Sequence, residues 1–314
     1  MPIWSPAPAT LTVGDLIDRT FDLLLGSTRE ERNRLTAPTD DVQTVIPVSY
    51  DLGSLKRGTY LAVDDEVMYV WSTTSSSMGS STITVERGDK GTTAVPHGAG
   101  SILAVNPYFT KYMVRRTVQD EIRSWGPQVF QIKSTDISAT EFVRGYDMGA
   151  LGDWFFVISV TESPDLMSAS KTDNSWGEVS YKIQRDTNTT AFPSGNALII
   201  TDPLGVFDVP RVFHVAYAAP IDVDATFNDA DPVTPMGLQS SELDIPPYGA
   251  AWRLAASREV RRMITEAQGE NTDLTNFPPG YQLKAAEGFK TLRDSRLQDA
   301  ISRLRSQYPI RRMS

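Results

Sequence analysis

The stretch FTKYMVRRTVQDEIRSWGP, residues 109–127, decides the fold class because it places a helix between two regions rich in β-strand signals. Its apolar residues recur mostly at intervals of three or four, which predicts an amphipathic helix over 109–125. Gly126 and Pro127 then end the helix. The apolar positions are Tyr112, Val114, Val118, Ile122 and Trp125.

Short runs of alternating apolar residues precede this helix, between residues 41 and 107. Turn-forming clusters, such as 87–91 and 98–100, separate the runs about every ten residues. Short strands at such spacing are typical of antiparallel β structure. We therefore expect a small β module, a barrel or a sandwich, over 41–107.

A second β region follows the helix, over residues 128–220. Its segments are separated by prolines, glycines and asparagines, which favour turns. This pattern predicts a larger antiparallel β-sandwich. Its expected strands are 154–160, 179–184, 197–201 and 211–217.

Helices are predicted near both ends of the chain. Residues 10–25 show helical spacing after the cap candidate Thr12 and stop at Gly26, with a polar linker up to residue 40. Residues 248–314 predict two further helices, over 248–268 and 281–307. The expected fold is α+β, with a helical core that carries two antiparallel β modules. The segments are 1–40 (helix and linker), 41–107 (small β module), 108–127 (core helix), 128–220 (β-sandwich), 221–247 (acidic, proline-rich linker) and 248–314 (C-terminal helices).

Charge is distributed unevenly along the 314 residues. The net charge is −9 overall, but residues 248–314 carry 12 Lys and Arg against 7 Asp and Glu. An acidic body with a basic end suggests charge complementarity between subunits or with an acidic partner, while a solvated helical face is the plainer alternative. The absence of cysteine excludes disulfides and thiolate-ligated metals. We expect neither a signal peptide nor a membrane span.

Sequence patterns for catalysis or cofactor binding are weak. The two histidines, His97 and His214, lie far apart, so a histidine metal site would need distant carboxylates. The glycines in 87–93 lack phosphate-loop spacing, and the acidic run 222–233 lacks the glycine and glutamate of a calcium loop. We therefore expect no enzyme activity, no metal and no cofactor.

Several stretches resemble one family of proteins. The segment GTYLAVDDEVMYV (58–70) is followed by ITVERG (83–88) and GTTA (91–94), and it closes with VNP (105–107). The helix 112–125 with the extended segment 126–130, and the pattern IPPYGAAWRL (245–254), add to the likeness. The first segments resemble structural proteins of tailed bacteriophages, connector and tail components among them. The last two narrow the resemblance to the head-to-tail connector (adaptor or neck) proteins. The resemblance touches about two-thirds of the chain and leaves 128–217 unmatched.

The resemblance implies a homo-oligomeric ring, expected to be dodecameric, in the neck of the virion and assembled in the host cytoplasm. Its partners would be the portal protein of the capsid and the next neck or tail protein, such as a stopper, a terminator or the tail tube. Double-stranded DNA would pass through without specific binding, and no membrane would be involved. The arginine-rich C-terminal helix would form the arm that meets the portal or a neighbouring subunit. Its expected interface residues are Arg293, Arg296, Arg303, Arg305, Tyr308, Arg311 and Arg312.

Three other functions stay open at this point. A minor tail or baseplate protein would accommodate the β modules equally well. A phage enzyme such as a cell-wall hydrolase would need a pair of catalytic carboxylates or a metal site, which the sequence does not indicate. A carbohydrate-binding module would use exposed tryptophans, for which Trp71, Trp154 and Trp176 are candidates.

Overall fold

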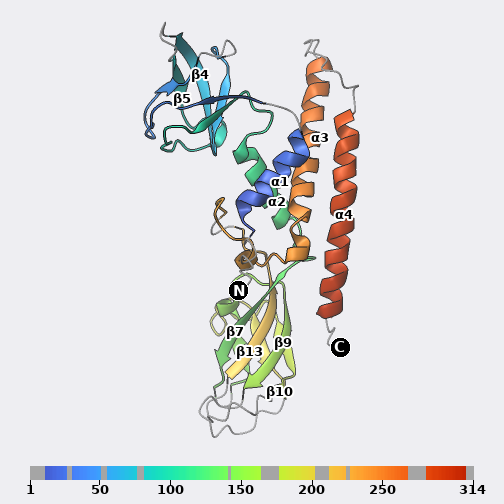
Figure 1. Ribbon diagram of the computed structural model, residues 1–314. Coiled ribbons are helices and arrows are strands. Elements are labelled where there is room, and N and C mark those ends of the chain that lie inside the picture. The colour runs from blue at the N-terminus through green and yellow to red at the C-terminus, as the bar shows by residue number, and fades with distance from the viewer. Residues whose placement is uncertain are drawn as a thin grey trace, which may run out of the picture.

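The computed structural model describes residues 11–26, 30–50, 55–75, 81–140, 143–163, 177–201, 212–223, 227–267 and 281–308. In these residues the chain forms four α-helices and three antiparallel sheets. The molecule is elongated, with a β module at either end of a layer of helices (Figure 1). The predicted α+β class is confirmed.

The four helices are α1 (Val13–Leu25), α2 (Lys111–Arg123), α3 (Ile245–Ala267) and α4 (Tyr281–Gln307). Thr12 caps α1 as predicted: its hydroxyl accepts from the Asp15 amide at 3.3 Å, and the Asp15 carboxylate accepts from the Thr12 amide at 2.8 Å. The helix α3 begins three residues before the predicted start. Pro246 and Pro247 fit there because the first turn of a helix needs no backbone N–H donors.

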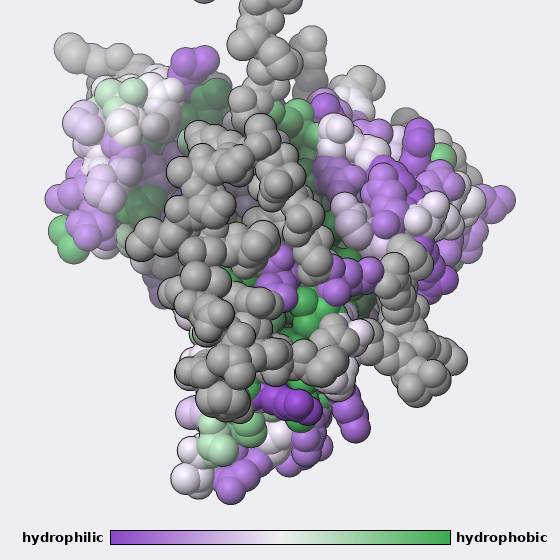
Figure 2. All heavy atoms as spheres, turned by 90° about the horizontal axis from the view of Figure 1, so that it is seen from below, coloured by the Kyte–Doolittle hydropathy of each residue, from purple (hydrophilic) through white to green (hydrophobic). Residues whose placement is uncertain are grey.

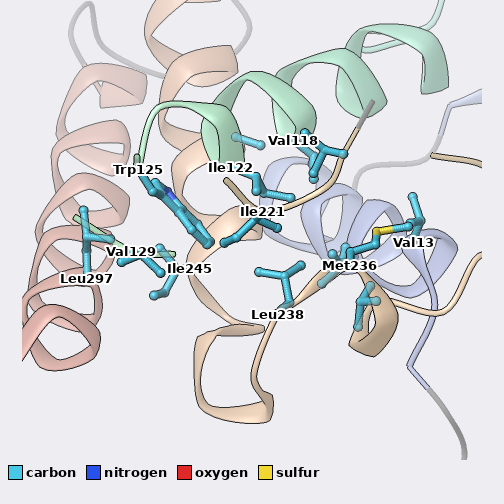
Figure 3. Close-up of a cluster of buried hydrophobic side chains, with 14 of the residues drawn as sticks. Val13, Val118, Ile122, Trp125, Val129, Ile221, Met236, Leu238, Ile245 and Leu297 are labelled. Atoms are coloured by element: carbon cyan, nitrogen blue, oxygen red, sulfur yellow. The ribbon is translucent and has the colours of Figure 1, made fainter. Parts of the chain in front are cut away.

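The helical core draws its side chains from both halves of the chain. Trp125, 1% exposed, points from the end of α2 towards Ile221, with Val129 and Ile245 of α3 nearby (Figure 3). Val13 of α1 and Leu297 of α4 belong to the same buried cluster. Burial of large side chains of this kind stabilises by about 1.5–3 kcal/mol each. One core therefore unites the first and the last of the four helices, α1 and α4.

The segment 221–247 differs from its prediction as a solvated linker. Apolar residues between its acidic ones turn into the helical core, and two short 3₁₀ turns, Thr234–Met236 and Ser240–Glu242, shape it. The linker prediction is wrong for the described residues, because the acidic and proline-rich average composition conceals inward-facing positions spaced along an irregular backbone. The buried residues are Ile221, Val223, Phe227, Val233, Met236 and Leu238.

The small β module is a six-stranded barrel with its own core. The strands follow the order β1-β6-β3-β4-β5-β2. The first and last meet where the Thr36 amide donates to the Pro47 carbonyl (3.1 Å) and the Ser49 amide to the Arg34 carbonyl (3.0 Å). The bounds are β1 (Glu31–Arg34), β2 (Val45–Val48), β3 (Tyr60–Val63), β4 (Glu66–Ser75), β5 (Ser81–Glu86) and β6 (Ile102–Val105).

Strand β1 lies inside the stretch predicted as a linker, so that part of the prediction is wrong. Its sequence is Glu-Arg-Asn-Arg, and only Asn33 faces inward. The Asn33 side chain donates to the Tyr50 carbonyl at 2.8 Å, which satisfies its amide inside the barrel. A strand with charged outer residues and one polar inner residue has no apolar alternation to detect.

The second β module is a sandwich of two sheets, as predicted. The sheet β10-β9-β13-β7 and the sheet β11-β12-β8 share one hydrophobic core, which contains Val160, Leu198 and Phe213. The polar edge strand β7 was not predicted, because its sequence QIKSTDIS lacks an apolar face. The bounds are β7 (Gln131–Ser138), β8 (Gly145–Asp147), β9 (Phe156–Ser163), β10 (Gly177–Glu178), β11 (Tyr181–Gln184), β12 (Ala197–Ile200) and β13 (Val212–Ala219), with 3₁₀ turns at Asp89–Gly91 and Gly149–Leu151 elsewhere in the chain.

Two helical glycines provide a matched test of packing between α2 and α3. An alanine Cβ at Gly249 of α3 would lie 2.3 Å from Cδ of Glu121, whereas one at Gly288 of α4 would meet no atom within 4 Å. We expect Gly249→Ala to lower the free energy of unfolding by about 1–3 kcal/mol, because the added methyl group would overpack the core there. We expect Gly288→Ala to raise it by about 0.5–1 kcal/mol through the lower backbone entropy of the unfolded chain. Urea denaturation followed by circular dichroism measures both, and equal effects of the two substitutions would contradict the packing at Gly249.

Candidate functional site

The helix α4 is the outermost element of the helical layer (Figure 1). It lies along α3 and touches the 3₁₀ turn Ser240–Glu242 near its C-terminal end. Its inward face is apolar and spaced at helical intervals, which is why it packs on α3. The inward residues are Ala286, Leu297, Ala300, Ile301 and Leu304. The remaining faces of α4 are largely exposed. A predicted interface residue can meet a partner only if it lies on one of these exposed faces.

Arg293, the first predicted interface residue, points inward. Its Nε donates to Oε1 of Glu121 at 2.7 Å, and its Nη1 donates to Asp294 at 2.8 Å. Burial alone would lower the pKa of Arg293, but these hydrogen bonds raise the pKa above its ordinary value. The Arg293 side chain is only 15% exposed, so its contacts lie within the chain.

Glu121 is the centre of a buried polar cluster that joins three helices. Besides Arg293 of α4, its carboxylate accepts from the Trp125 indole at 2.9 Å and pairs with Arg253 of α3 at 2.7 Å. The Glu121 side chain is fully buried. Gly249 leaves the space that this carboxylate occupies. Buried ion pairs of this kind fix how helices meet, because the charges are satisfied in one arrangement only.

Arg303 also makes its contacts within the chain. Its Nη2 donates to Oε1 of Glu242 at 2.6 Å, and its Nη1 donates to the Ser241 hydroxyl. Burial raises the pKa of Glu242 above its ordinary value, although Arg303 and the Gln239 amide act in the opposite direction. This pair attaches the C-terminal half of α4 to the segment that follows the β-sandwich.

The other predicted interface residues do not form one patch. Arg296 and Arg305 are exposed, but nine residues correspond to two and a half helical turns, so they point to opposite flanks of α4. Tyr308 is half-buried against the helical core. Arg311 and Arg312 lie outside the described residues. The structure thus brings none of the five described residues together into a single basic surface.

A different feature runs along the outer side of α4, which we call the outer seam. Its residues recur at alternating intervals of three and four, are all exposed, and are mostly small. Leu292, 49% exposed, is its one large apolar residue. Charge alone does not identify the seam, but the alternating spacing of its small residues is a signal that the sequence contains. The seam consists of Ala285, Gly288, Leu292, Ser295, Asp299, Ser302 and Ser306.

Similarity to known proteins gives no further guide to this site. No protein-family model and no curated protein matches the chain. None of the helices, as far as the structure describes them, is both long and apolar enough to cross a membrane. Within the same described ranges, no three histidine, aspartate or glutamate side chains are grouped so that they could hold a metal ion.

His97 belongs to a buried cluster in the barrel. Its Nε2 lies 2.9 Å from Oε2 of Glu66, a carboxylate with no exposed surface. Arg87 donates two hydrogen bonds to the same carboxylate, from Nε to Oε1 at 2.6 Å and from Nη2 to Oε2 at 2.8 Å. Arg87 also donates to the carbonyls of Asp40, Gln43 and Val95. The cluster therefore holds together the loops at one end of the barrel. The glycines in 87–93, which superficially resemble a phosphate loop, form a turn next to this cluster.

The other residues considered for ligands are separate from one another. His214 lies on the sandwich, with Nδ1 2.7 Å from Asp136. Trp71 is 44% exposed on the barrel, and the Arg57 guanidinium lies 4.8 Å from its ring centre. Arg185 lies 5.3 Å from the ring centre of Trp154 on the sandwich, and Trp176 falls outside the described residues. Arginines lie over both described rings, which disfavours these two faces as sugar platforms.

The Glu66 carboxylate makes the stability of the barrel depend on acid pH. Burial would raise the pKa of Glu66, but the hydrogen bonds from Arg87 and His97 prevail and lower it from 4.5 to about 2. Because the folded pKa is depressed, the contribution is complete above about pH 4.5. It is lost as the pH falls towards 2, and it amounts to about 3 kcal/mol.

We therefore expect the unfolding free energy of the native chain to fall steeply between pH 4.5 and 2, and that of Glu66→Gln to fall less. Chemical denaturation at a series of pH values measures both slopes. Glu31→Gln, on the exposed side of the same barrel, serves as the control and should keep the native slope. Identical slopes for Glu66→Gln and the native chain would show that Glu66 does not carry the effect.

Proposed function

We propose that this chain is a virion structural subunit that forms a ring between the capsid portal and the tail of a bacteriophage, a head-to-tail connector. The observation that carries the proposal is the arrangement of the helical layer. Segments from the start, middle and end of the chain build one core, and the two β modules are carried at opposite ends of it (Figure 1). Such a body offers different surfaces at its two ends and its sides, as a subunit between two unlike partners requires.

The outer side of α4 would form the contacts between subunits. Small residues along the outer seam permit another helix to approach closely. In a view from below, the side of the molecule that carries α4 is largely hydrophilic (Figure 2). A polar surface on which Leu292 is the large apolar residue of the outer seam suits an interface that must remain soluble before assembly. Arg296 and Arg305 flank this surface, and the portal or a neighbouring subunit would meet them there.

A minor tail or baseplate protein is the second candidate. The exposed aromatic Trp71 on the barrel and the sandwich at the far end of the molecule fit contacts within a tail as well. The helices at both ends of the chain, and the resemblance of segments 112–130 and 245–254 to connector proteins, favour the neck.

The location is tested by labelling intact virions with gold-conjugated antibodies against this chain and viewing them by electron microscopy. We expect label at the neck, between head and tail. Label at the distal tip would overturn the connector proposal in favour of the tail candidate.

Assembly is tested with the purified chain by light scattering coupled to gel filtration, and by negative-stain microscopy for rings. Ser295→Trp on the outer seam should reduce the ring population, whereas Thr82→Trp on the exposed side of the barrel should not. Rings that persist unchanged in Ser295→Trp would contradict the role given to the seam.

A further inference from the structure

The barrel and the helical layer have separate hydrophobic cores. The barrel core contains Leu35, Met68 and Ile83, and none of its residues belongs to the helical core. Parts of a chain that are joined without a shared apolar interface are expected to move relative to one another. The position of the barrel therefore depends on the polar contacts between the two.

Arg115 of α2 makes the principal polar contact between the two parts. Its Nη2 lies 2.6 Å from Asp65, in the turn between β3 and β4 of the barrel, and its Nε donates to the same carboxylate at 3.1 Å. On the other side, Nη2 lies 2.6 Å from Asp229 and Nη1 donates to the Phe227 carbonyl at 2.7 Å. One guanidinium thus holds the barrel turn and the 227–231 loop together.

The environment of Arg115 makes this contact stronger than an ordinary surface ion pair. The arginine side chain is 14% exposed, whereas Asp65 and Asp229 are each 41% exposed. Lys111, one turn earlier on α2, also pairs with Asp229 and keeps that carboxylate in place. A planar guanidinium that binds several acceptors in a fixed geometry gives a defined orientation, while partly exposed carboxylates let the contact open.

A second contact lies at the point where the chain leaves the barrel. The Tyr108 amide donates to the Glu30 carboxylate at 3.1 Å, so the strands that enter and leave the barrel are held side by side. The guanidinium of Arg258, on α3, lies 3.9 Å from the ring centre of Tyr108. These residues form the pivot, because they lie where the chain enters and leaves the barrel and Arg258 joins them to α3.

We propose that Arg115 is a latch that sets the orientation of the barrel, and that the barrel turns as a rigid body about the Glu30–Tyr108 pivot when the Arg115–Asp65 contact opens. Opening requires no change inside either core, because each core is complete in itself. The device is independent of the function proposed above. The closed and the open latch give the chain two orientations of the barrel relative to the helical layer.

The absence of cysteine allows a direct measurement. Spin labels at Ser72→Cys on the barrel and Ser302→Cys on α4, both exposed positions, report the distance between the two parts by pulsed electron resonance. Mixing labelled with excess unlabelled chain keeps distances between subunits out of the signal. The variants to compare are Asp65→Asn, which opens the latch on the barrel side, and Arg116→Ala, an exposed neighbour of the latch on the same helix.

We expect one narrow distance distribution in the native chain and in Arg116→Ala. We expect a shifted and broadened distribution in Asp65→Asn, and in the native chain at high salt. A second label pair within the helical layer, Asp22→Cys with Ser302→Cys, should remain unchanged and shows that the fold is intact. An unaltered barrel distance in Asp65→Asn would overturn the proposal, as would a change of the same size in Arg116→Ala.

Discussion

Replacing Glu121 by alanine is expected to lower the free energy of unfolding by about 3–5 kcal/mol. The substitution leaves Arg253 and Arg293 without their buried acceptor and the Trp125 indole without its partner. Uncompensated charge in an apolar core is far more costly than the loss of an exposed ion pair. Because α2, α3 and α4 meet at this carboxylate, we expect the whole helical layer to unfold at lower urea concentration.

Asp120→Asn is the matched control for this prediction. Asp120 precedes Glu121 on the same helix, is exposed, and pairs with Arg123 at 3.4 Å. Its removal should change the free energy of unfolding by less than about 0.5 kcal/mol. Urea denaturation followed by circular dichroism compares the two variants. Equal midpoints for both would mean that the buried cluster contributes nothing to the helical layer.

Arg87→Ala is expected to have an effect of similar size on the barrel, about 3–5 kcal/mol. Glu66 would be left charged and buried with one hydrogen-bonding side chain, His97, instead of two. The carbonyls of Asp40, Gln43 and Val95 would also lose a donor, so the two loops that contain them would lose their common anchor. Hydrogen exchange should show the loss in the barrel strands, while the helical layer keeps its protection.

Lys56→Ala supplies the comparison for Arg87→Ala. Lys56 is an exposed cation in the same barrel, so the two variants change the net charge equally. Protection in the barrel should remain native in Lys56→Ala. If both variants lost protection alike, total charge and not the buried pair would govern barrel stability.

The helices were predictable from the sequence because their apolar spacing is regular and their ends carry clear signals. Thr12 and Gly26 mark α1, and the Gly126–Pro127 pair follows α2 closely. The barrel and the sandwich followed from turn-forming residues at short intervals. The physical basis is local in each case, since caps, turns and periodicity act over a few residues.

The remaining features depend on contacts between distant residues. Strand β1 is stabilised by its partner β6 and by the Asn33 amide inside the barrel, neither of which its own four residues reveal. The arginines of α4 looked alike in the sequence, but Arg293 and Arg303 meet carboxylates 172 and 61 residues away. Whether an arginine faces a partner protein or the interior is decided by those distant carboxylates, and charge counting cannot distinguish the two.

Because distant segments share one helical core, the parts of the chain can fold only in a certain order during synthesis. The barrel closes within residues 31–105, so it can fold while later residues are still being synthesised. The helical core joins Val13 to Leu304 and is complete only when nearly the whole chain has left the ribosome. Until then the apolar faces of α1 and α2 lack the side chains of α3 and α4 that cover them in the folded chain. A growing chain therefore carries a finished barrel beside a helical core that stays incomplete until the last helix has docked.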